Sequence, residues 1–212
     1  MLADDALRTK STLYGQRVVL RPLGPEHTDV FWRSLHDPEV RRLTGTHAEF
    51  QRDQIDAWLA SRSDHSDRLD LAIHRRHDDV YLGELALIEL DPANESAGVR
   101  IALTSTAIAG RGYGSDAMRT LLAHAFDTVG LHRIHLDVFA FNTHAIRTYE
   151  RLGFVHEGRA REALLWDGIR HDAVLMSMLR PDWREARQRR ASQPETSDAD
   201  RTPARDDDEE RP

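Results

Sequence analysis

Gly110-Arg111-Gly112-Tyr113-Gly114 stands directly before an amphipathic pattern that runs from Ser115 to Val129. Glycines just before a helix let the backbone turn tightly and leave several N–H groups pointing at one place, with the positive end of the helix dipole behind them. Such an arrangement binds a pyrophosphate group. The stretch therefore predicts a phosphate-binding loop, and the surrounding sequence indicates which molecule carries the phosphates.

The flanking segments predict the order strand, loop, helix, strand, helix. Val99 to Leu103 read as a strand before the loop, and apolar residues at helical spacing support the helix after it. Residues 134–138 alternate in polarity as in a half-buried strand. A second helix then follows, with Asn142 as its N-cap and Gly153 at its end.

Two other phosphate-binding folds fit the loop less well. A dinucleotide-binding fold has G-x-G-x-x-G directly after its strand and an acidic residue about 20 residues later. Here Ser115 stands at the third glycine position and the loop lies in the middle of the chain, although Asp137 is available for the acidic role. A P-loop is excluded because no Gly-Lys-Ser/Thr follows.

Two motifs together resemble those of the GCN5-related N-acetyltransferases (GNAT), and within them the RimJ/RimL-type and spermidine-type bacterial branch. They are Ala109-Gly110-Arg111-Gly112-Tyr113-Gly114 with its helix, and the later Asn142…Ala145…Tyr149-Glu150-Arg151-Leu152-Gly153-Phe154. The resemblance covers roughly Gly15 to Trp183. It implies acetyl-CoA as donor, a primary amine as acceptor, and direct transfer without an acyl-enzyme, which fits a chain that has no cysteine.

The resemblance also implies a binding site for acetyl-CoA. The loop from Ala109 to Ser115 would hold the pyrophosphate through its N–H groups, and Arg111 would add a charged contact unless it is an ordinary solvated arginine. Ala109 departs from the family, which often has Gln or Arg there. The pantetheine arm would lie against the end of the strand, at Ile101, Ala102 and Leu103. Asn142 would bind the arm, cap the helix, or do both.

For the chemistry, the resemblance implies that Tyr149 protonates or hydrogen-bonds the leaving thiolate, unless it is one more apolar member of its helix. The attacking amine must lose a proton, and many relatives carry a glutamate near the position of Gly98 for this purpose. Since this chain has none there, Glu84 on the strand from Tyr81 to Leu90 is the best substitute. Glu95 and Asp137 are weaker candidates.

The N-terminal half is expected to hold the acceptor site. Arg17 to Pro22 predict a first strand, and helices over Glu26–Leu35 and Arg52–Ser61 are expected on either side of a loop around Pro38 and Gly45. In the family such a helix pair covers the acceptor groove. Two strand pairs should follow: Leu69–His74 with Tyr81–Leu90, and Val155–Leu165 with Arg170–Leu179, the second joined by a type I′ turn at Asp167-Gly168.

Aromatic residues are candidates for the wall of the acceptor pocket. Trp32 and Trp166 would hold a cation or an apolar side chain there, and packing in the core or at its rim is the alternative for each. The 12 histidines form no helical H-E-x-x-H pattern and no cysteine accompanies them, so we expect no metal site.

Composition sets the outer bounds. The chain has 212 residues, of which 40% are hydrophobic, which suits one acetyltransferase domain over residues 12–183 and a charged segment over residues 184–212. Residues 184–190 should extend a helix, whereas Gln193 to Pro212 should be disordered. Met1 to Ser11 lack a signal peptide and no run is long enough to span a membrane, so we expect a cytoplasmic protein.

The predicted fold is α/β, with a mixed, mostly antiparallel sheet, helices on both faces and a split in the middle for CoA. The net charge of −7 argues against nucleic acid as a partner and fits a cationic acceptor weakly. The acceptor is a protein N-terminus, a polyamine or an amine-bearing small molecule, and the protein is a monomer or a homodimer. Two alternatives stay open: a non-catalytic acyl-CoA sensor, and succinyl transfer, for which Arg100 would be the cation near the acyl end.

Overall fold

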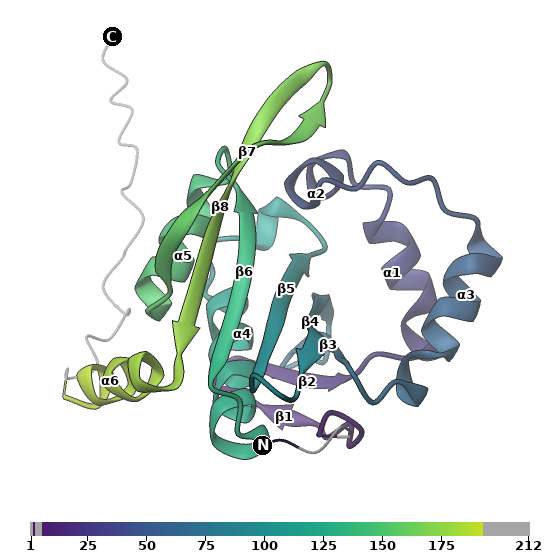
Figure 1. The fold of residues 1–212 in the computed structure, drawn as a ribbon. Helices are drawn as coiled ribbons and strands as arrows, with labels where there is room; N and C mark the ends of the chain where they lie inside the picture. The colour runs from purple at the N-terminus through teal and green to yellow at the C-terminus, as the bar shows by residue number, and fades with distance from the viewer. Residues whose placement is uncertain (1, 3–5, 193–212) are drawn as a thin grey trace, which may run out of the picture.

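One sheet forms the centre of the computed structural model, which describes residue 2 and residues 6–192. The strand order is β1-β2-β3-β4-β5-β6-β8-β7, with helices on both faces of the sheet (Figure 1). The strands are β1 (Leu13–Tyr14), β2 (Val18–Pro22), β3 (Leu69–Arg75), β4 (Tyr81–Asp91), β5 (Ser96–Leu103), β6 (Arg133–Phe139), β7 (Val155–Trp166) and β8 (Ile169–Leu179).

The α-helices are α1 (Thr28–Ser34), α2 (Pro38–Thr44), α3 (Arg52–Ala60), α4 (Tyr113–Ala123), α5 (Thr143–Leu152) and α6 (Arg180–Ala191). Short 3-10 helices occupy Pro25–His27, Arg62–Asp64 and Thr106–Ile108, and a π-helix over His124–Val129 continues α4. The expected helix over Glu26–Leu35 is thus a 3-10 turn followed by α1.

The sheet opens between β5 and β6. These two strands run parallel and pair only over the first three residues of β5, Ser96 to Gly98, opposite Arg133 to His135. From Val99 to Leu103, β5 pairs with β4 alone. Every other pair of neighbouring strands is antiparallel. The prediction of a mixed, mostly antiparallel sheet that splits in its middle is confirmed.

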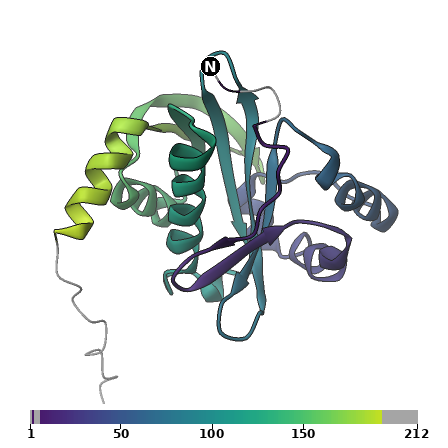
Figure 2. The same ribbon diagram turned by 90° about the horizontal axis from the view of Figure 1, so that it is seen from below.

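The two faces of the sheet bury two separate cores, because alternate residues of each strand point to opposite faces. The larger core lies under α4, whose apolar stripe includes Met118 and Leu121. The smaller one lies under α1 and α3 and contains Phe31, Ile55 and Leu59. Figure 2 shows α4 and the α1–α3 helices on opposite sides of the central strands.

The start of α4 is tied to the start of β2 by a buried carboxylate. Asp116, 3% exposed, accepts hydrogen bonds from the backbone N–H groups of Arg17 (2.7 Å) and Val18 (3.1 Å). A Cβ at Gly15 would come within 2.5 Å of the Asp116 carboxylate, so only glycine fits there without a shift. These contacts fix the position of the glycine loop relative to the sheet.

The prediction of a loop around Pro38 and Gly45 is wrong, because this segment forms the helix α2. Asp37 caps it by accepting hydrogen bonds from the N–H groups of Glu39 and Val40, Pro38 takes the first helical position, and Gly45 ends it at φ +64°. Both end signals are present in the sequence. The helix was missed because it is short and none of its residues is fully buried.

At the C-terminal end, α6 runs through the expected boundary between residues 183 and 184. Trp183 and Ala186 are buried, and Trp183 stacks on Phe126 with ring centroids 6.0 Å apart, so this helix packs against the sheet domain. The predicted disorder of residues 193–212 lies outside the described residues. The β7–β8 turn has φ +48° at Asp167 and +77° at Gly168, as the predicted type I′ turn requires.

Candidate active site

The glycine loop turns through two left-handed residues into α4. Gly110 has φ +77° and Gly112, the N-cap of α4, has φ +83°. A Cβ at either position would meet no atom closer than 3.6 Å, so glycine is needed here for its backbone conformation and not for space. Since no side chain caps this helix, the N–H groups of its first turn stay available to an anion.

A cavity of about 250 Å³ lies beside this loop. Its walls come from the end of β5, the loop, the start of α4 and the exposed side of α5. Most of the predicted acetyl-CoA contacts line it, namely Ile101, Ala102, Leu103, Ala109, Gly110, Gly112, Gly114, Ser115 and Asn142, together with Tyr149. The structure thus brings residues from both motifs to one place.

Two predicted residues of the loop lie outside this cavity. The Arg111 side chain is exposed, and its carbonyl oxygen accepts a hydrogen bond from the guanidinium of Arg17 (3.1 Å). Tyr113 is partly buried against the larger core. Arg17 places a cation at the loop that the sequence analysis missed, because 94 residues separate it from Arg111 and no local pattern connects them.

Two further groups of residues that line the larger cavity were not predicted from the sequence. Val40, Leu43 and Thr44 come from α2, which had been expected to be a loop. His144, Thr148 and Arg151 come from α5. The members of the second group are three or four residues apart and so share one face of α5, but none of them is three or four residues from the predicted Tyr149, so that residue did not point to them.

Asn142 serves as a helix cap and also lines the cavity. Its side-chain oxygen accepts a hydrogen bond from the N–H of Ala145 (3.1 Å). Its side-chain NH₂ donates to no other residue in the part of the chain that the structure describes. The cap therefore leaves the amide donors free toward the cavity, and the two roles considered from the sequence are compatible.

Tyr149 projects from α5 at the cavity wall and packs against Phe154, with ring centroids 5.8 Å apart. Burial, and then the negative charge of Asp137, raise the pKa of the Tyr149 phenol to about 12. The phenol is thus protonated throughout the neutral range and can act as a hydrogen-bond donor.

A second, smaller cavity of about 40 Å³ adjoins the first. Both are lined by Val40, Thr44, Ala102 and Leu103, which therefore form their common border. The smaller cavity is also lined by Ser34, Leu35, Thr46, Tyr81, Gly83, Glu84 and Arg100. It lies on the acceptor side predicted from the sequence, next to α1 and α2.

Glu84 is the carboxylate of the smaller cavity. It lies on β4 directly opposite Ala102 of β5, and its side chain is 14% exposed. Burial raises the pKa of Glu84 to about 7, against the smaller opposing effect of the Arg100 guanidinium 3.5 Å away. A carboxyl group with this pKa suits a general base at neutral pH.

A bulge in β4 brings Tyr81 to the same cavity as Glu84. Ile73 of β3 pairs with Gly83, but the next residue, His74, pairs with Tyr81, so Leu82 is the extra residue. Gly83 has φ +148°, and a Cβ there would come within 2.2 Å of the Ala102 carbonyl oxygen. Only glycine permits this close approach of β4 to β5.

The other predicted residues lie apart from the two cavities. Glu95 precedes β5 and is 3.9 Å from Arg180, at the opposite end of the strand from Leu103. Asp137 is exposed on β6. Neither lines a cavity, so Glu84 is the candidate base that the structure places at the site.

The two tryptophans also lie outside the cavities. Trp32 packs beside the smaller core, 4.6 Å from the His36 ring, and Trp166 lies 4.9 Å from the His47 ring. Their contact with an acceptor therefore stays a prediction.

Across residues 2 and 6–192, no group of three or more His, Asp or Glu side chains is placed to hold a metal ion. No helix in this same part of the chain is both long and apolar enough to cross a membrane.

Comparison with known proteins gives the family. The model of the acetyltransferase (GNAT) domain matches residues 17–155. The SPbeta prophage-derived uncharacterized N-acetyltransferase YokL of Bacillus subtilis is 23% identical over 80% of this chain and 93% of its own length. The putative ribosomal N-acetyltransferase YdaF of the same organism is 31% identical over 50% of this chain and 58% of its own.

Solved structures agree on the fold. The crystal structure of the spermidine N-acetyltransferase from Vibrio cholerae in complex with CoA and spermine superimposes with a TM-score of 0.71. It covers 79% of this chain and 98% of that one, at 22% sequence identity.

Proposed function

The chain belongs to the GNAT acetyltransferase family and is an acetyl-CoA-dependent N-acetyltransferase, and we propose that it acetylates a primary amine at the border of the two cavities. One observation carries the proposal. The cavity beside the glycine loop and the cavity that contains Glu84 share Ala102 and Leu103 at their border. A thioester in the first and an amine in the second would meet there.

The residues around the larger cavity fit acetyl-CoA. The uncapped first turn of α4 offers N–H groups to a pyrophosphate. On the side toward β6, the backbone of β5 from Val99 to Leu103 has no strand partner, so its N–H and C=O groups are available to the amides of the pantetheine arm. The NH₂ group of Asn142 adds a donor. Acetyl-CoA would supply the activated acetyl group.

The reaction then needs a group that accepts a proton from the amine and a group that stabilises the negative charge developing on the sulfur. The amine nitrogen attacks the thioester carbonyl carbon, a C–N bond forms, and the C–S bond breaks with its electron pair leaving on sulfur. Glu84 accepts the proton that the amine loses. Tyr149 donates a hydrogen bond or its proton to the sulfur as negative charge develops. No acyl-enzyme is needed, and a chain without cysteine fits direct transfer.

The two pKa values indicate what Glu84 and Tyr149 can each contribute. At neutral pH about half of the Glu84 carboxyl groups are ionised and able to accept a proton, because their pKa is about 7. The Tyr149 phenol, with a pKa of about 12, is a weaker acid than a thiol, which titrates near 8.5. Its main contribution is therefore a hydrogen bond to the sulfur.

An assay of CoA-thiol release, together with calorimetric binding of acetyl-CoA, tests this function. The panel of acceptors contains amino acids, polyamines, aminoglycosides and short peptides. Tyr149→Phe should lower kcat by roughly 10²-fold or more while the Kd for acetyl-CoA stays unchanged. Tyr14→Phe is the matched control, because Tyr14 is 71% exposed on β1. Absence of acetyl-CoA binding, or full activity of Tyr149→Phe, would contradict the proposal.

A further inference from the structure

We propose that Arg100 binds a carboxylate of the acceptor, so that the acceptor is an amine that carries a carboxylate on the same carbon, as a free α-amino acid does. Arg100 lines the smaller cavity beside Glu84. The assignment rests on the proposed amine transfer, since it concerns the second substrate of that reaction. It separates two of the acceptor classes that the family leaves open, amino acids and polyamines.

The guanidinium of Arg100 has unused donors. Its side chain is 58% exposed, and within residues 2 and 6–192 its one polar contact is the 3.5 Å ion pair between Nη2 and Oε1 of Glu84. A guanidinium carries five N–H donors in a planar fork that matches the two oxygens of a carboxylate. With one long contact, most of the N–H donors of Arg100 are available to a ligand.

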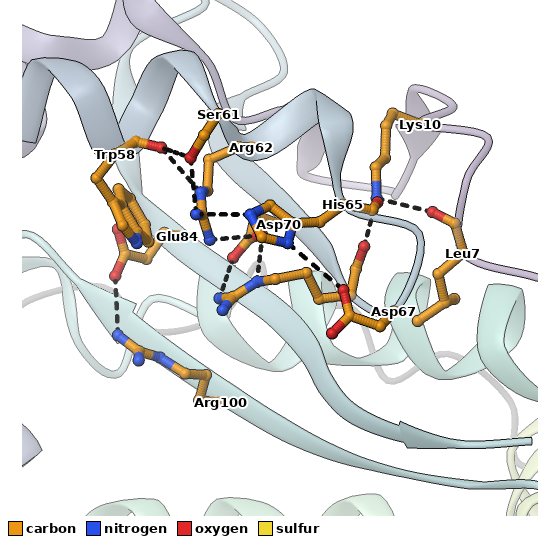
Figure 3. Close-up of polar contacts among 11 residues, drawn as sticks. Leu7, Lys10, Trp58, Ser61, Arg62, His65, Asp67, Asp70, Glu84 and Arg100 are labelled. Atoms are coloured by element: carbon orange, nitrogen blue, oxygen red, sulfur yellow. Dashed lines mark hydrogen bonds and ion pairs between the residues drawn. The ribbon is translucent and has the colours of Figure 1, made fainter. Parts of the chain in front are cut away.

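The neighbouring arginines are satisfied, in contrast. Arg68 donates from Nε and Nη2 to the two oxygens of Asp70 at 2.7 and 2.6 Å. Arg62 donates to the carbonyl of Trp58 and the hydroxyl of Ser61. In Figure 3, no dashed line joins the Arg100–Glu84 pair to the contacts of Arg62 and Asp70. Arg68 and Arg62 thus serve the fold, and Arg100 is left for a ligand.

The charges of the cavity disfavour a polyamine. Among its lining residues, Glu84 is the acidic side chain and Arg100 the basic one, so the cavity offers at most one negative charge beside one positive charge. A polyamine carries several ammonium groups and would meet the Arg100 cation with no second carboxylate to offset it. An amino acid carries one group of each sign. Since Glu84 and Arg100 are 3.5 Å apart, they suit an amine and a carboxylate that are attached to the same carbon.

The same contact would prepare Glu84 for its role as base. The Arg100 cation holds down the pKa of Glu84, although burial outweighs this effect. When a substrate carboxylate pairs with Arg100, the positive charge of Arg100 is neutralised. The pKa of Glu84 then rises, and Glu84 becomes a stronger base. The buried Tyr81 hydroxyl, which has no hydrogen-bond partner within the described residues, offers a further donor at the same cavity.

A carboxylate at Arg100 has a second possible source, the acyl group of succinyl-CoA. The register of β5 argues for the acceptor. Arg100 pairs with Ala86 of β4, and its side chain reaches Glu84 and the smaller cavity. It does not line the larger cavity, which holds the predicted acetyl-CoA contacts.

Thiol release with matched acceptors tests the assignment. Each of several α-amino acids is compared with the amine that lacks its carboxylate, for example phenylalanine with phenethylamine, and spermidine is added. The wild-type protein should prefer the amino acid by roughly tenfold or more in kcat/KM. Arg100→Gln should lose this preference, Arg100→Lys should keep part of it, and the Kd for acetyl-CoA should not change. Arg189→Gln, 72% exposed on α6, is the control.

The outcomes separate the two proposals. Equal rates with amino acids and their amines, a preference for spermidine, or an unchanged preference in Arg100→Gln would each overturn the assignment. So would transfer from succinyl-CoA to plain amines that depends on Arg100, since the carboxylate would then belong to the acyl group.

If acetyl-CoA binds but no amine is acetylated, amine transfer itself fails. Arg100 is then judged by calorimetry of the protein–CoA complex with N-acetylphenylalanine and N-acetylphenethylamine. Binding of the first alone, lost in Arg100→Gln, would support a carboxylate site. No difference between the two compounds would overturn it.

Discussion

Around α4 and α5, the predicted acetyl-CoA site is made largely of backbone: left-handed glycines, uncapped N–H groups and a strand edge without a partner. Around β3, β4 and α3, on the acceptor side, the protein instead buries charged side chains. Asp70 is 4% exposed at its side chain, Arg62 7% and Glu84 14%. One side is the proposed site of acetyl-CoA, and the other is the proposed site of the acceptor amine.

The acceptor side depends on residues that are distant in sequence. Lys10 donates hydrogen bonds to the carbonyl oxygens of Leu7, His65 and Arg68, and so joins the N-terminal segment to the loop before β3 (Figure 3). Burial lowers the pKa of Lys10 and of Arg62. Charges removed from water in this way destabilise the fold unless each has its partner. The acceptor side should therefore be sensitive to single charge changes.

Glu84→Gln tests the acceptor side most directly. We expect kcat/KM to fall by roughly 10²- to 10⁴-fold because the base is lost, while acetyl-CoA binds as before. In the wild type, kcat/KM should rise with pH through about 7, and the variant should lack this limb. Glu89→Gln, on the same strand and 72% exposed, should behave like the wild type. An unchanged pH profile in Glu84→Gln would assign the base elsewhere.

Asp70→Asn tests whether the buried charges also stabilise the fold. The substitution removes the carboxylate that pairs with Arg68 and lies 3.8 Å from Arg62, and it leaves two cations in a buried place. We expect the free energy of unfolding to fall by about 3–5 kcal/mol, measured by denaturant titration. Asp67→Asn is the control, because Asp67 is 73% exposed. Equal stability of the two variants would mean that water reaches the Asp70 cluster.

The same contrast explains what the sequence could predict. The glycine loop, the α4 stripe and the Asn142 cap are local patterns, and Asn142 and Tyr149 reached one cavity as expected. Glu84 was found by elimination, as an acidic residue on the neighbouring strand. Arg17 carries no local signal, since 94 residues separate it from Arg111. Arg68 and Asp70 are only two residues apart, but the burial of Asp70 depends on neighbouring strands and is not visible in the sequence. The helix α2 had capping signals but lacked a buried stripe.

Glu84 should also make stability depend on pH. The pKa of Glu84 is about 7 in the folded protein, above the ordinary value of 4.5. Between pH 4.5 and pH 7, Glu84 is therefore largely protonated in the folded state and largely ionised in the unfolded state. This contribution to stability is fully present below pH 4.5 and is lost as the pH rises through 7. The difference between these two pKa values corresponds to roughly 3 kcal/mol in the free energy of unfolding.

Relative to Glu84→Gln, the wild-type free energy of unfolding should therefore fall by about this amount between pH 5 and pH 8. Denaturant titrations of both proteins across this range measure the difference. Glu89→Gln, on the same strand and 72% exposed, is titrated in parallel as the control. A flat difference for Glu84→Gln would mean that Glu84 is ionised without cost, and the contrast between the two sides would be smaller than the burial implies.

The smallest effect is expected on the acetyl-CoA side, at Gly112→Ala. Its φ of +83° costs an alanine about 1–2 kcal/mol of stability. Gly168→Ala, at φ +77° in the β7–β8 turn and likewise free of close atoms, should cost the same. Only Gly112→Ala should also weaken acetyl-CoA binding in calorimetry. The backbone at the N-cap of α4 would shift to relieve the strain of the alanine, and the first N–H groups of the helix would then no longer point to one place. If both variants bind acetyl-CoA equally well, the loop backbone is not what holds the pyrophosphate, and the acetyl-CoA side would depend on side chains such as Arg17 as much as the acceptor side does.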